Sequence, residues 1–434
     1  MTETQPIIVV GAGIVGVSAA IWLKRAGRQV TLVDRGEPGM GTSYGNGGVL
    51  AACAMVPVTA PGLIHKGPGY LLNRNFPLFL RWSYLPRLVP WLVRYLSHAN
   101  DADTRRIAAG LAPIVSDSVE QHRALTKGTD SAAWMSEGPY SFAYKDRAAF
   151  DADAYTFGLR RDHGFVPEIL EGAAVREFEP AFGPAVGCLA VMRDHGWIRD
   201  PRAYVAALVE EFLKLGGVWH SAEVRDFTLT GGRVSAVVTD RDTLPCSEVV
   251  LATGVWSKPL MAKLGLKVPL ESERGYHIVY EGAENGPSKP FMVAAGKFVA
   301  TPMQDGLRCA GVVEFGGLEA GPSRAPFALL RRQVAQAFPQ LEAVREEEWQ
   351  GHRPAPADSL PLIGQVGGSG VYAGFGHHHI GLTGGPKTGR LLAQMITGQT
   401  PNMDMRPYDP QRFARGHTLN NKTKKPTQQG ETIL

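Results

Sequence analysis

The stretch PIIVVGAGIVGVSAAIWLKRAGRQVTLVDR, residues 6–35, decides the fold. Its apolar run at 7–10 predicts a short buried strand of a parallel sheet. Three glycines follow with the spacing G-x-G-x-x-G, then a predicted helix, and then a second predicted strand at 29–33 that ends in an acid, Asp34. A unit of this kind binds the diphosphate of a dinucleotide at the helix N-terminus and its ribose at the acid.

The three glycines of this unit have separate physical tasks. Gly11 allows the tight turn, Gly13 lets the backbone approach a pyrophosphate, and Gly16 lets the helix pack closely on the strand. Ile14 and Val15 open the helix, whose free N–H groups and positive dipole end face the phosphates. Strand, glycines, helix, strand and terminal acid together favour dinucleotide binding over a chance glycine turn.

The residues after Arg35 distinguish flavin from nicotinamide dinucleotides. In a nicotinamide enzyme, strands and helices should continue to alternate, but residues 36–55, GEPGMGTSYGNGGVLAACAM, show no strand pattern. A long ordered loop is usually functional. This one suits a cofactor that is buried along its whole length and touched by backbone amides. FAD is therefore preferred, with a nicotinamide dehydrogenase as the alternative.

The composition is that of a globular chain. Of 434 residues 44% are hydrophobic and 20% are charged, enough for two or three structural units. The net charge of +4, without a basic stripe interleaved with aromatics, argues against nucleic acid as a partner. The four cysteines form no CxxC, so neither a zinc cage nor a disulfide framework is expected. With no apolar run of membrane-spanning length and no secretion signal, we expect a cytoplasmic protein.

The middle of the chain predicts a second domain inserted into the first. A helix begins at Asp200–Pro201, a hairpin turns at Gly231–Gly232, and a buried strand at 249–252 returns to the cofactor sheet. Strands around 274–280 and 298–314 predict a separate antiparallel sheet. We therefore expect an α/β fold in which a Rossmann-like FAD-binding domain is interleaved with an α+β substrate domain. The expected ranges are 1–52, 198–262 and 350–400 for FAD binding, 53–197 and 263–349 for substrate binding, and 401–434 for a C-terminal extension and polar tail.

Six motifs, taken in order, resemble the D-amino acid oxidase-like flavoproteins, which include glycine and sarcosine oxidases and bacterial FAD-dependent D-amino acid dehydrogenases. They are VVGAGIVGVSAA, GTSYGNGGVL, VVLATGVWS, RGYHIVY, WQGHRPAPADSLPLIG and GHHHIGLTGGPKTGRLLA, and the similarity spans roughly residues 5–410. It implies non-covalent FAD, because the cysteine that covalently flavinylated relatives carry near GHRPAPADSLP is absent. The motifs and the resemblance together predict these cofactor contacts: Gly11, Gly13, Ile14, Val15, Gly16, Asp34, Arg35, Thr42, Ser43, Asn46, Gly47, Val224, Thr253, Gly254, Trp256, Gly376, His377, Gly381, Leu382 and Thr383.

The same resemblance implies a substrate site. Arg353 matches the arginine that holds the substrate carboxylate, and a planar guanidinium does grip a carboxylate with two bonds. The alternative is a structural arginine in an ion pair. Tyr276 matches a tyrosine near the substrate, or else it is an aromatic packed within its strand. Asp358 is expected to brace its loop rather than to catalyse.

Three consecutive histidines, at 377–379, raise the question of a metal. Neighbouring side chains diverge on both strands and helices, and no Asp, Glu or Cys flanks them, so we predict no metal site. The resemblance assigns His377 to a Gly-His pair, and puts His378 and His379 where relatives have small residues beside the flavin. There they either contact substrate or ring, or are plain loop residues. The helix that follows directs its N-terminal amides at the flavin ring, and Gly381, Thr383 and Lys387 are the expected contributors.

The function predicted from these features is oxidation of a D-amino acid by hydride transfer from Cα to flavin N5, with a quinone or another non-oxygen electron acceptor. The alternatives are a D-proline or D-hydroxyproline dehydrogenase, a sarcosine- or glycine-type oxidase that makes H2O2, and a flavin subunit of a larger complex. Residues 77–96 place Leu88, Trp91, Leu92 and Tyr95 on one helical face. That helix either covers the core or makes a peripheral contact with the inner face of the cytoplasmic membrane.

Overall fold

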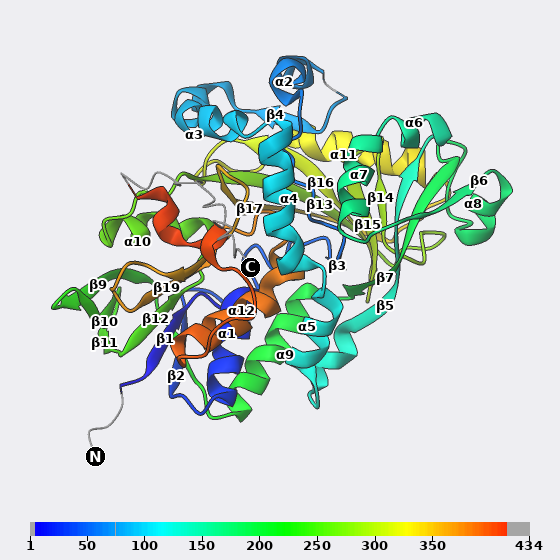
Figure 1. The fold of residues 1–434 in the computed structure, drawn as a ribbon. Coiled ribbons are helices and arrows are strands. Elements are labelled where there is room, and N and C mark those ends of the chain that lie inside the picture. The colour runs from blue at the N-terminus through cyan, green and yellow to red at the C-terminus, as the bar shows by residue number, and fades with distance from the viewer. Residues whose placement is uncertain (1–4, 74, 415–434) are drawn as a thin grey trace, which may run out of the picture.

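The computed structural model describes residues 5–73 and 75–414 and is built on two large sheets (Figure 1). The first is the predicted cofactor sheet, six strands in the order β18-β19-β12-β1-β2-β8. All neighbours are parallel except the edge strand β18, which is antiparallel to β19. Its strands are β1 (Ile7–Val10), β2 (Val30–Asp34), β8 (Val218–Ser221), β12 (Glu248–Leu251), β18 (Leu362–Gln365) and β19 (Val371–Phe375).

Helices cover one face of this sheet, and a small sheet covers the other. Helices α1 (Ile14–Arg25), α9 (Pro201–Lys214) and α12 (Gly381–Ile396) share one apolar core with β1 (Figure 1). The other face packs against α10 (Ser257–Lys263) and the sheet of β9 (Val224–Thr230), β10 (Arg233–Thr239) and β11 (Thr243–Pro245). A sheet apolar on both faces must be covered on both, which explains the continuous apolar run of β1.

Local sequence signals explain where several elements begin and turn. The Asp200 side chain caps α9 by accepting from the amides of Arg202 and Ala203, at 2.9 and 3.1 Å. Gly231 and Gly232 both adopt positive φ and join β9 to β10, as the hairpin prediction requires. The helix start at Asp200 and this hairpin are confirmed.

The second large sheet, with ten strands, confirms the predicted separate antiparallel sheet. Its main path is β17 (Arg345–Pro356), β13 (Leu270–Glu281), β16 (Gly306–Phe315), β15 (Phe298–Met303), β14 (Phe291–Val293), β5 (Met135–Tyr144), β7 (Cys188–Ile198) and β3 (Val49–Leu50). Strands β4 (Leu78–Leu80) and β6 (Glu168–Glu171) pair with β16 and β7. Among the described strands of this sheet, only the β4–β16 and β5–β14 pairs are parallel. Helix α11 (Arg324–Ala337) packs on β13 and β16.

Two boundaries differ from the sequence prediction. Residues 350–356, expected in the FAD-binding domain, extend β17 and pair with β13 of the larger sheet. The loop at 36–55 also contains the two-residue strand β3, which joins the same sheet. Both segments were expected in the cofactor domain, but their backbones pair with strands of the larger sheet. The polar tail predicted for residues 418–434 lies outside the described residues.

Seven further helices and several short turns complete the described part of the chain. They are α2 (Leu63–Leu72), α3 (Leu85–Ser97), α4 (Asp101–Val115), α5 (Ser118–Thr126), α6 (Arg147–Asp151), α7 (Ala154–Asp162) and α8 (Ala173–Phe178), with short turns at Trp82–Tyr84, Asp130–Trp134, Gly254–Trp256, Arg406–Tyr408 and Pro410–Phe413. Within the described ranges, none of the helices has the length and apolar character needed to cross a bilayer.

Helix α3 lies on the edge of the larger sheet beside β17. Leu88, Trp91 and Tyr95 are buried against Ala355 and Ala357, which confirms that this face of the predicted helix covers the core. The Trp91 indole also donates to the carbonyl of Ala355 at 3.0 Å.

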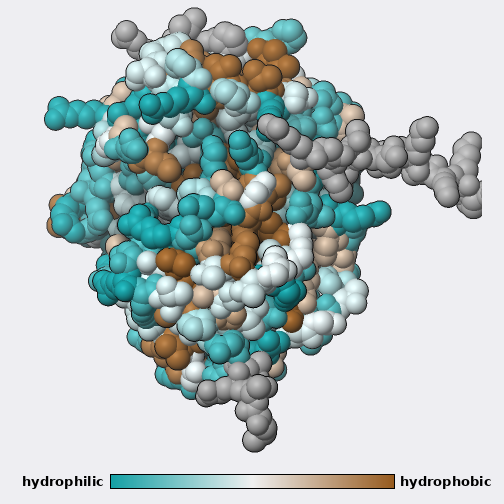
Figure 2. All heavy atoms as spheres, turned by 90° about the vertical axis from the view of Figure 1, so that its left-hand side faces the viewer, coloured by the Kyte–Doolittle hydropathy of each residue, from teal (hydrophilic) through white to brown (hydrophobic). Residues whose placement is uncertain are grey.

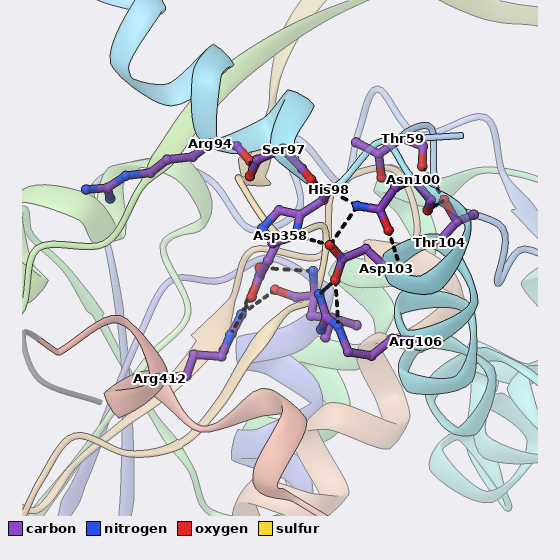
Figure 3. Close-up of polar contacts among 11 residues, drawn as sticks. Thr59, Arg94, Ser97, His98, Asn100, Asp103, Thr104, Arg106, Asp358 and Arg412 are labelled. Atoms are coloured by element: carbon purple, nitrogen blue, oxygen red, sulfur yellow. Dashed lines mark hydrogen bonds and ion pairs between the residues drawn. The ribbon is translucent and has the colours of Figure 1, made fainter. Parts of the chain in front are cut away.

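The end of α3 is tied to the start of α4 (Figure 3). Asn100 caps α4 by accepting from the amide of Asp103 at 2.9 Å. The Asp103 carboxylate also lies 3.3 Å from Nδ1 of His98, at the C-terminus of α3. The helix that covers β17 is therefore anchored at both its buried face and its C-terminal end.

Candidate active site

A cavity of about 570 Å³ runs along the carboxyl ends of β1, β2 and β12, where ligands bind in open α/β sheets. Every predicted cofactor contact lines it except Gly16, Gly47 and Thr383. Lining residues that the sequence prediction missed include Ala12, Met40, Glu223, Lys263 and Pro354. Most of these are neighbours of predicted residues, so a wider window around each motif would have found them.

Gly11 and Gly16 have no room for a side chain. A Cβ on Gly11, whose φ is +107°, would lie 2.5 Å from the carbonyl oxygen of Ala252. A Cβ on Gly16 would lie 1.9 Å from the carbonyl oxygen of Gly11. Gly16 is absent from the cavity wall because it sits behind the turn, where it permits the predicted contact between helix and strand.

Asp34 is fixed at the end of β2. Its Oδ2 accepts from the amide of Ala12 at 2.7 Å, and its Oδ1 accepts from the amide of Gly36 at 3.0 Å. The glycine turn and the acid are thus joined before any ligand binds. Beside them, the Arg35 guanidinium lies 4.9 Å from the ring centre of Trp256, and both residues line the cavity. The pair forms a cationic aromatic wall suited to a purine base.

The far end of the cavity reaches the start of α12. The first-turn amides of a helix have no partner within it, and the first turn of α12 carries no acidic side chain. Gly381 and Leu382 line the cavity there. His377 is tied back to the helix, because its Nε2 lies 2.8 Å from Oγ1 of Thr388, and burial lowers the pKa of this imidazole to about 4. The arrangement supplies N–H donors and a positive dipole end, with no competing charge on His377.

A buried ionic cluster lies beside this end of the cavity. The register of β13 and β17 places Glu273 opposite Arg353, and Oε1 of Glu273 accepts from Nη1 of Arg353 at 2.9 Å. Oε2 of Glu273 lies 2.5 Å from Nε2 of His378. Nδ1 of His378 then lies 2.8 Å from Nδ1 of His379. The structure therefore brings Arg353, His378 and His379 together around an acid that the sequence analysis did not predict.

Glu273 carries a charge in this cluster although it is only 6% exposed. Burial by itself would raise the pKa of the carboxyl, but His378 and Arg353 outweigh it and hold that pKa well below its usual range. His378 is held in place as well: its φ is +53°, and its amide donates to the carbonyl of Pro354 at 3.0 Å. A non-glycine residue in this region is strained, and such strain concentrates at functional sites.

Arg353 packs flat over Gly275. A Cβ on Gly275 would lie 2.5 Å from Cζ of the guanidinium, so the missing side chain is what lets Arg353 lie there. The Arg353 side chain remains 20% exposed, and within the described chain only its Nη1 donates a hydrogen bond. Nitrogens remain available for an incoming carboxylate. Of the cluster only His378 also lines the cofactor cavity.

Tyr276 lies on the opposite face of β13. Its hydroxyl donates to Oε2 of Glu314 at 2.5 Å and accepts from the amide of Ser323 at 3.1 Å. The same Glu314 oxygen lies 3.0 Å from Nη1 of Arg274, which is fully buried. Strand alternation separates residue 276 from 273 and 275, so the structure does not bring Tyr276 to the Arg353 cluster.

Asp358 braces its loop, as expected. Its carboxylate pairs with Arg412 at 2.7 Å and accepts from the amide of Leu360 at 3.3 Å (Figure 3). This contact fastens the 3-10 turn Pro410–Phe413 to the segment after β17. In the part of the chain that the structure describes, no group of three or more His, Cys, Asp or Glu side chains could hold a metal ion.

The residues present fit a dinucleotide cofactor. The glycine turn at residues 11–13, the acid at the end of β2 and the donor-rich start of α12 all open on one elongated cavity. These features define the class of nucleotide-dependent α/β oxidoreductases. The family model of FAD dependent oxidoreductases, DAO, matches residues 6–395, and the chain belongs to that family. The cofactor is FAD, as predicted, and the residues named above would hold it.

Individual relatives are similar to this chain over almost its whole length. The chain is 39% identical to a D-amino-acid oxidase of Bradyrhizobium diazoefficiens over 422 residues, covering 95% of this chain and 100% of that one. It is 31% identical to D-amino acid dehydrogenase 2 of Pseudomonas aeruginosa, covering 92% and 97%. Among solved structures, L-proline dehydrogenase from P. horikoshii shares the fold with a TM-score of 0.72 at 19% identity, covering 96% and 99%.

Proposed function

We propose that this protein oxidises a D-amino acid at Cα and passes the electrons to a quinone or another non-oxygen acceptor. When bound, FAD supplies the oxidising power by accepting the Cα hydrogen as a hydride at N5. The chain's own residues bind and orient the substrate. An open-chain imino acid product hydrolyses to an oxo acid and ammonia, whereas a cyclic imine persists.

The proposal rests on the guanidinium of Arg353, which lies beside the cofactor cavity and, within the described chain, donates a hydrogen bond from Nη1 only. Its Nη1 serves Glu273, which leaves the other nitrogens to hold a substrate carboxylate with paired, charge-assisted bonds. Such a clamp holds Cα at one place relative to the cavity, which is the positional contribution that hydride transfer needs. The curated relatives named D-amino acid oxidase and dehydrogenase support the choice of substrate class.

The test is anaerobic bleaching of the yellow holoenzyme by a substrate panel. We expect D-amino acids to bleach it and their L-enantiomers, as matched controls, to leave it oxidised. Bleaching by sarcosine or glycine alone would establish the amine oxidase alternative. Bleaching by D-proline or D-hydroxyproline alone would establish a dehydrogenase of cyclic D-amino acids. The acceptor is then read from turnover: H2O2 production in air would contradict a non-oxygen acceptor, and turnover only with a quinone analogue would support it.

The exposed side of α2, α3 and the turn Trp82–Tyr84 supports a peripheral membrane contact for electron delivery. Trp82 and Val93 are 62% and 64% exposed, Ile64 and Val89 are also exposed, and Arg87 lies among them. Figure 2 shows hydrophobic side chains near the top of this face of the molecule, where Figure 1 places α2 and α3. Exposed apolar side chains beside arginines suit an anionic lipid surface.

Sedimentation with anionic vesicles tests the membrane contact. We expect the holoenzyme to sediment with the vesicles and the Trp82→Ser/Val93→Ser variant to remain in the supernatant. Val344, 89% exposed on the connection before β17, provides the matched control, and Val344→Ser should bind like the wild type. Equal binding of all three proteins, or no binding by the wild type, would contradict the contact.

A further inference from the structure

Three groups in the ionic cluster are joined in a line that can carry a proton. The line runs from Glu273 to Nε2 of His378, and from Nδ1 of His378 to Nδ1 of His379. Because an ionised carboxylate can only accept, the His378 ring carries a hydrogen on Nε2. In a contact between two Nδ1 atoms one ring donates and the other accepts, so one hydrogen is shared between them. When both rings are neutral, His379 is the donor and its Nε2 is free to take up a proton.

We propose that His379 and His378 form a proton relay for the substrate amine, with Glu273 as the positioning residue that holds the charge at its inner end. The relay presupposes the amino acid oxidation proposed above. His379 is exposed, whereas His378 and Glu273 are buried, so the line leads from an accessible ring to an enclosed ion pair.

The proton steps balance without any additional reactant. One N–H bond of the substrate ammonium breaks, and its proton bonds to Nε2 of His379. The hydrogen on Nδ1 of His379 moves to Nδ1 of His378, which becomes a cation beside the Glu273 carboxylate. The amine is then neutral, so its lone pair is available to form the C=N bond when Cα loses its hydrogen with the bonding electrons, for which FAD would supply the acceptor. The stored proton afterwards returns through His379 to solvent.

The surrounding charges place the cation on His378 rather than on His379. Four groups face Glu273: Arg353 from β17, Tyr95 from α3, and the two histidines from the loop before α12. The Glu273 carboxylate lies 2.5 Å from the ring of His378, so a proton that arrives at His379 is passed on to the ring beside that charge. Arg353 repels a cation in the cluster, and the Glu273 carboxylate offsets that repulsion at His378.

The pH dependence of kcat/KM tests the relay. General acid–base groups of this kind contribute roughly 10² to 10⁴ in rate, so Glu273→Gln should lower kcat/KM at neutral pH by about 10²-fold. Above the pKa of the free substrate amine the variant should approach the wild type, because the amine then arrives neutral. Glu271→Gln, a buried glutamate two residues earlier on the same strand face, is the matched control and should follow the wild-type profile. A loss in Glu273→Gln that is equal at every pH would overturn the relay.

A second variant keeps the test independent of how well Glu273→Gln folds. His379→Gln, at an exposed position, should show the same loss at neutral pH and the same recovery at high pH. The double variant should be no worse than either single variant, because groups that act as one unit are not additive. Losses that multiply would contradict a shared path.

Histidine NMR provides a readout that does not depend on turnover. In the ¹⁵N-histidine-labelled holoenzyme we expect His378 and His379 to titrate as one unit that takes up a single proton. In Glu273→Gln that uptake should move to lower pH, because the carboxylate no longer stabilises the cation. Two rings that each bind a proton independently would overturn the relay. This result stands even if the substrate panel identifies a different donor, so failure of the proposed function and failure of the relay are distinguishable.

Discussion

Replacement of Arg353 by methionine is the most demanding test of the proposed substrate site. The structure leaves the guanidinium with one bond to Glu273 and with free nitrogens for a carboxylate. Two charge-assisted bonds contribute about 1.5–3 kcal/mol each, so their loss should lower kcat/KM by roughly 10² to 10⁴-fold. The FAD content should not change, because Arg353 does not line the cofactor cavity. Arg353→Lys keeps the charge without the planar fork, so its kcat/KM should fall between those of the wild type and Arg353→Met.

The assay is the rate of anaerobic bleaching of the cofactor as a function of substrate concentration. Arg331→Met is the matched control: this partly exposed arginine pairs with Glu346 and Glu348 at the other end of β17. It should bleach at the wild-type rate. An Arg353→Met enzyme that retains wild-type kcat/KM would refute the clamp. A loss of turnover that merely follows a loss of bound FAD would refute it as well.

Three further predictions rest on single features of the structure. Gly275→Ala should displace the guanidinium over that glycine and lower kcat/KM by about 10²-fold, without loss of FAD; unchanged kinetics would show that the position of Arg353 is not critical. FAD should pass quantitatively through an ultrafilter after acid unfolding, since the four cysteines are buried and none lines the cavity, and flavin retained with the protein would contradict non-covalent binding. Burial lowers the pKa of His122 from 6.5 to about 4. Below pH 6.5 the unfolded chain therefore binds a proton that the folded chain does not, and the free energy of unfolding falls as the pH drops toward 4. At pH 5 this amounts to ~2 kcal/mol, and His122→Gln should reduce the decline in thermal stability between pH 7 and 5; equal slopes for both proteins would contradict it.

The cofactor half of the site could be predicted from the sequence because its determinants are local. Gly11, Gly13 and Asp34 belong to one short segment, and each acts through its own backbone or at the end of its own strand. The same holds for Gly381 at the start of α12. Where the prediction was less complete, as at Ala12 or Gly36, most of the added residues are chain neighbours of predicted ones.

The substrate half was harder because its contacts depend on register between distant strands. Glu273 and Arg353 are 80 residues apart in sequence and meet only because β13 pairs with β17 in one particular alignment. The alternation of β13 does indicate that residues 273 and 275 share a face and that Tyr276 lies on the other. What alternation cannot indicate is which face meets the cofactor domain, and the resemblance alone favoured Tyr276.

The position of β17 links Arg353, the proposed substrate anchor, to the residues that line the cofactor cavity. The strand carries Arg353 in the larger sheet and ends at Pro356, and β18 of the cofactor sheet begins only at Leu362. The chain then passes through β19 and returns at His378, whose amide bonds to the carbonyl of Pro354 on β17. This backbone contact closes a loop between the two sheets at the ionic cluster itself. Because Arg353 and the start of α12 lie on one continuous segment closed in this way, neither can shift relative to the other without breaking a main-chain hydrogen bond. The proposed hydride transfer would depend on that relative position, so we expect the segment from β17 to α12 to set the reaction geometry through its backbone as well as through its side chains.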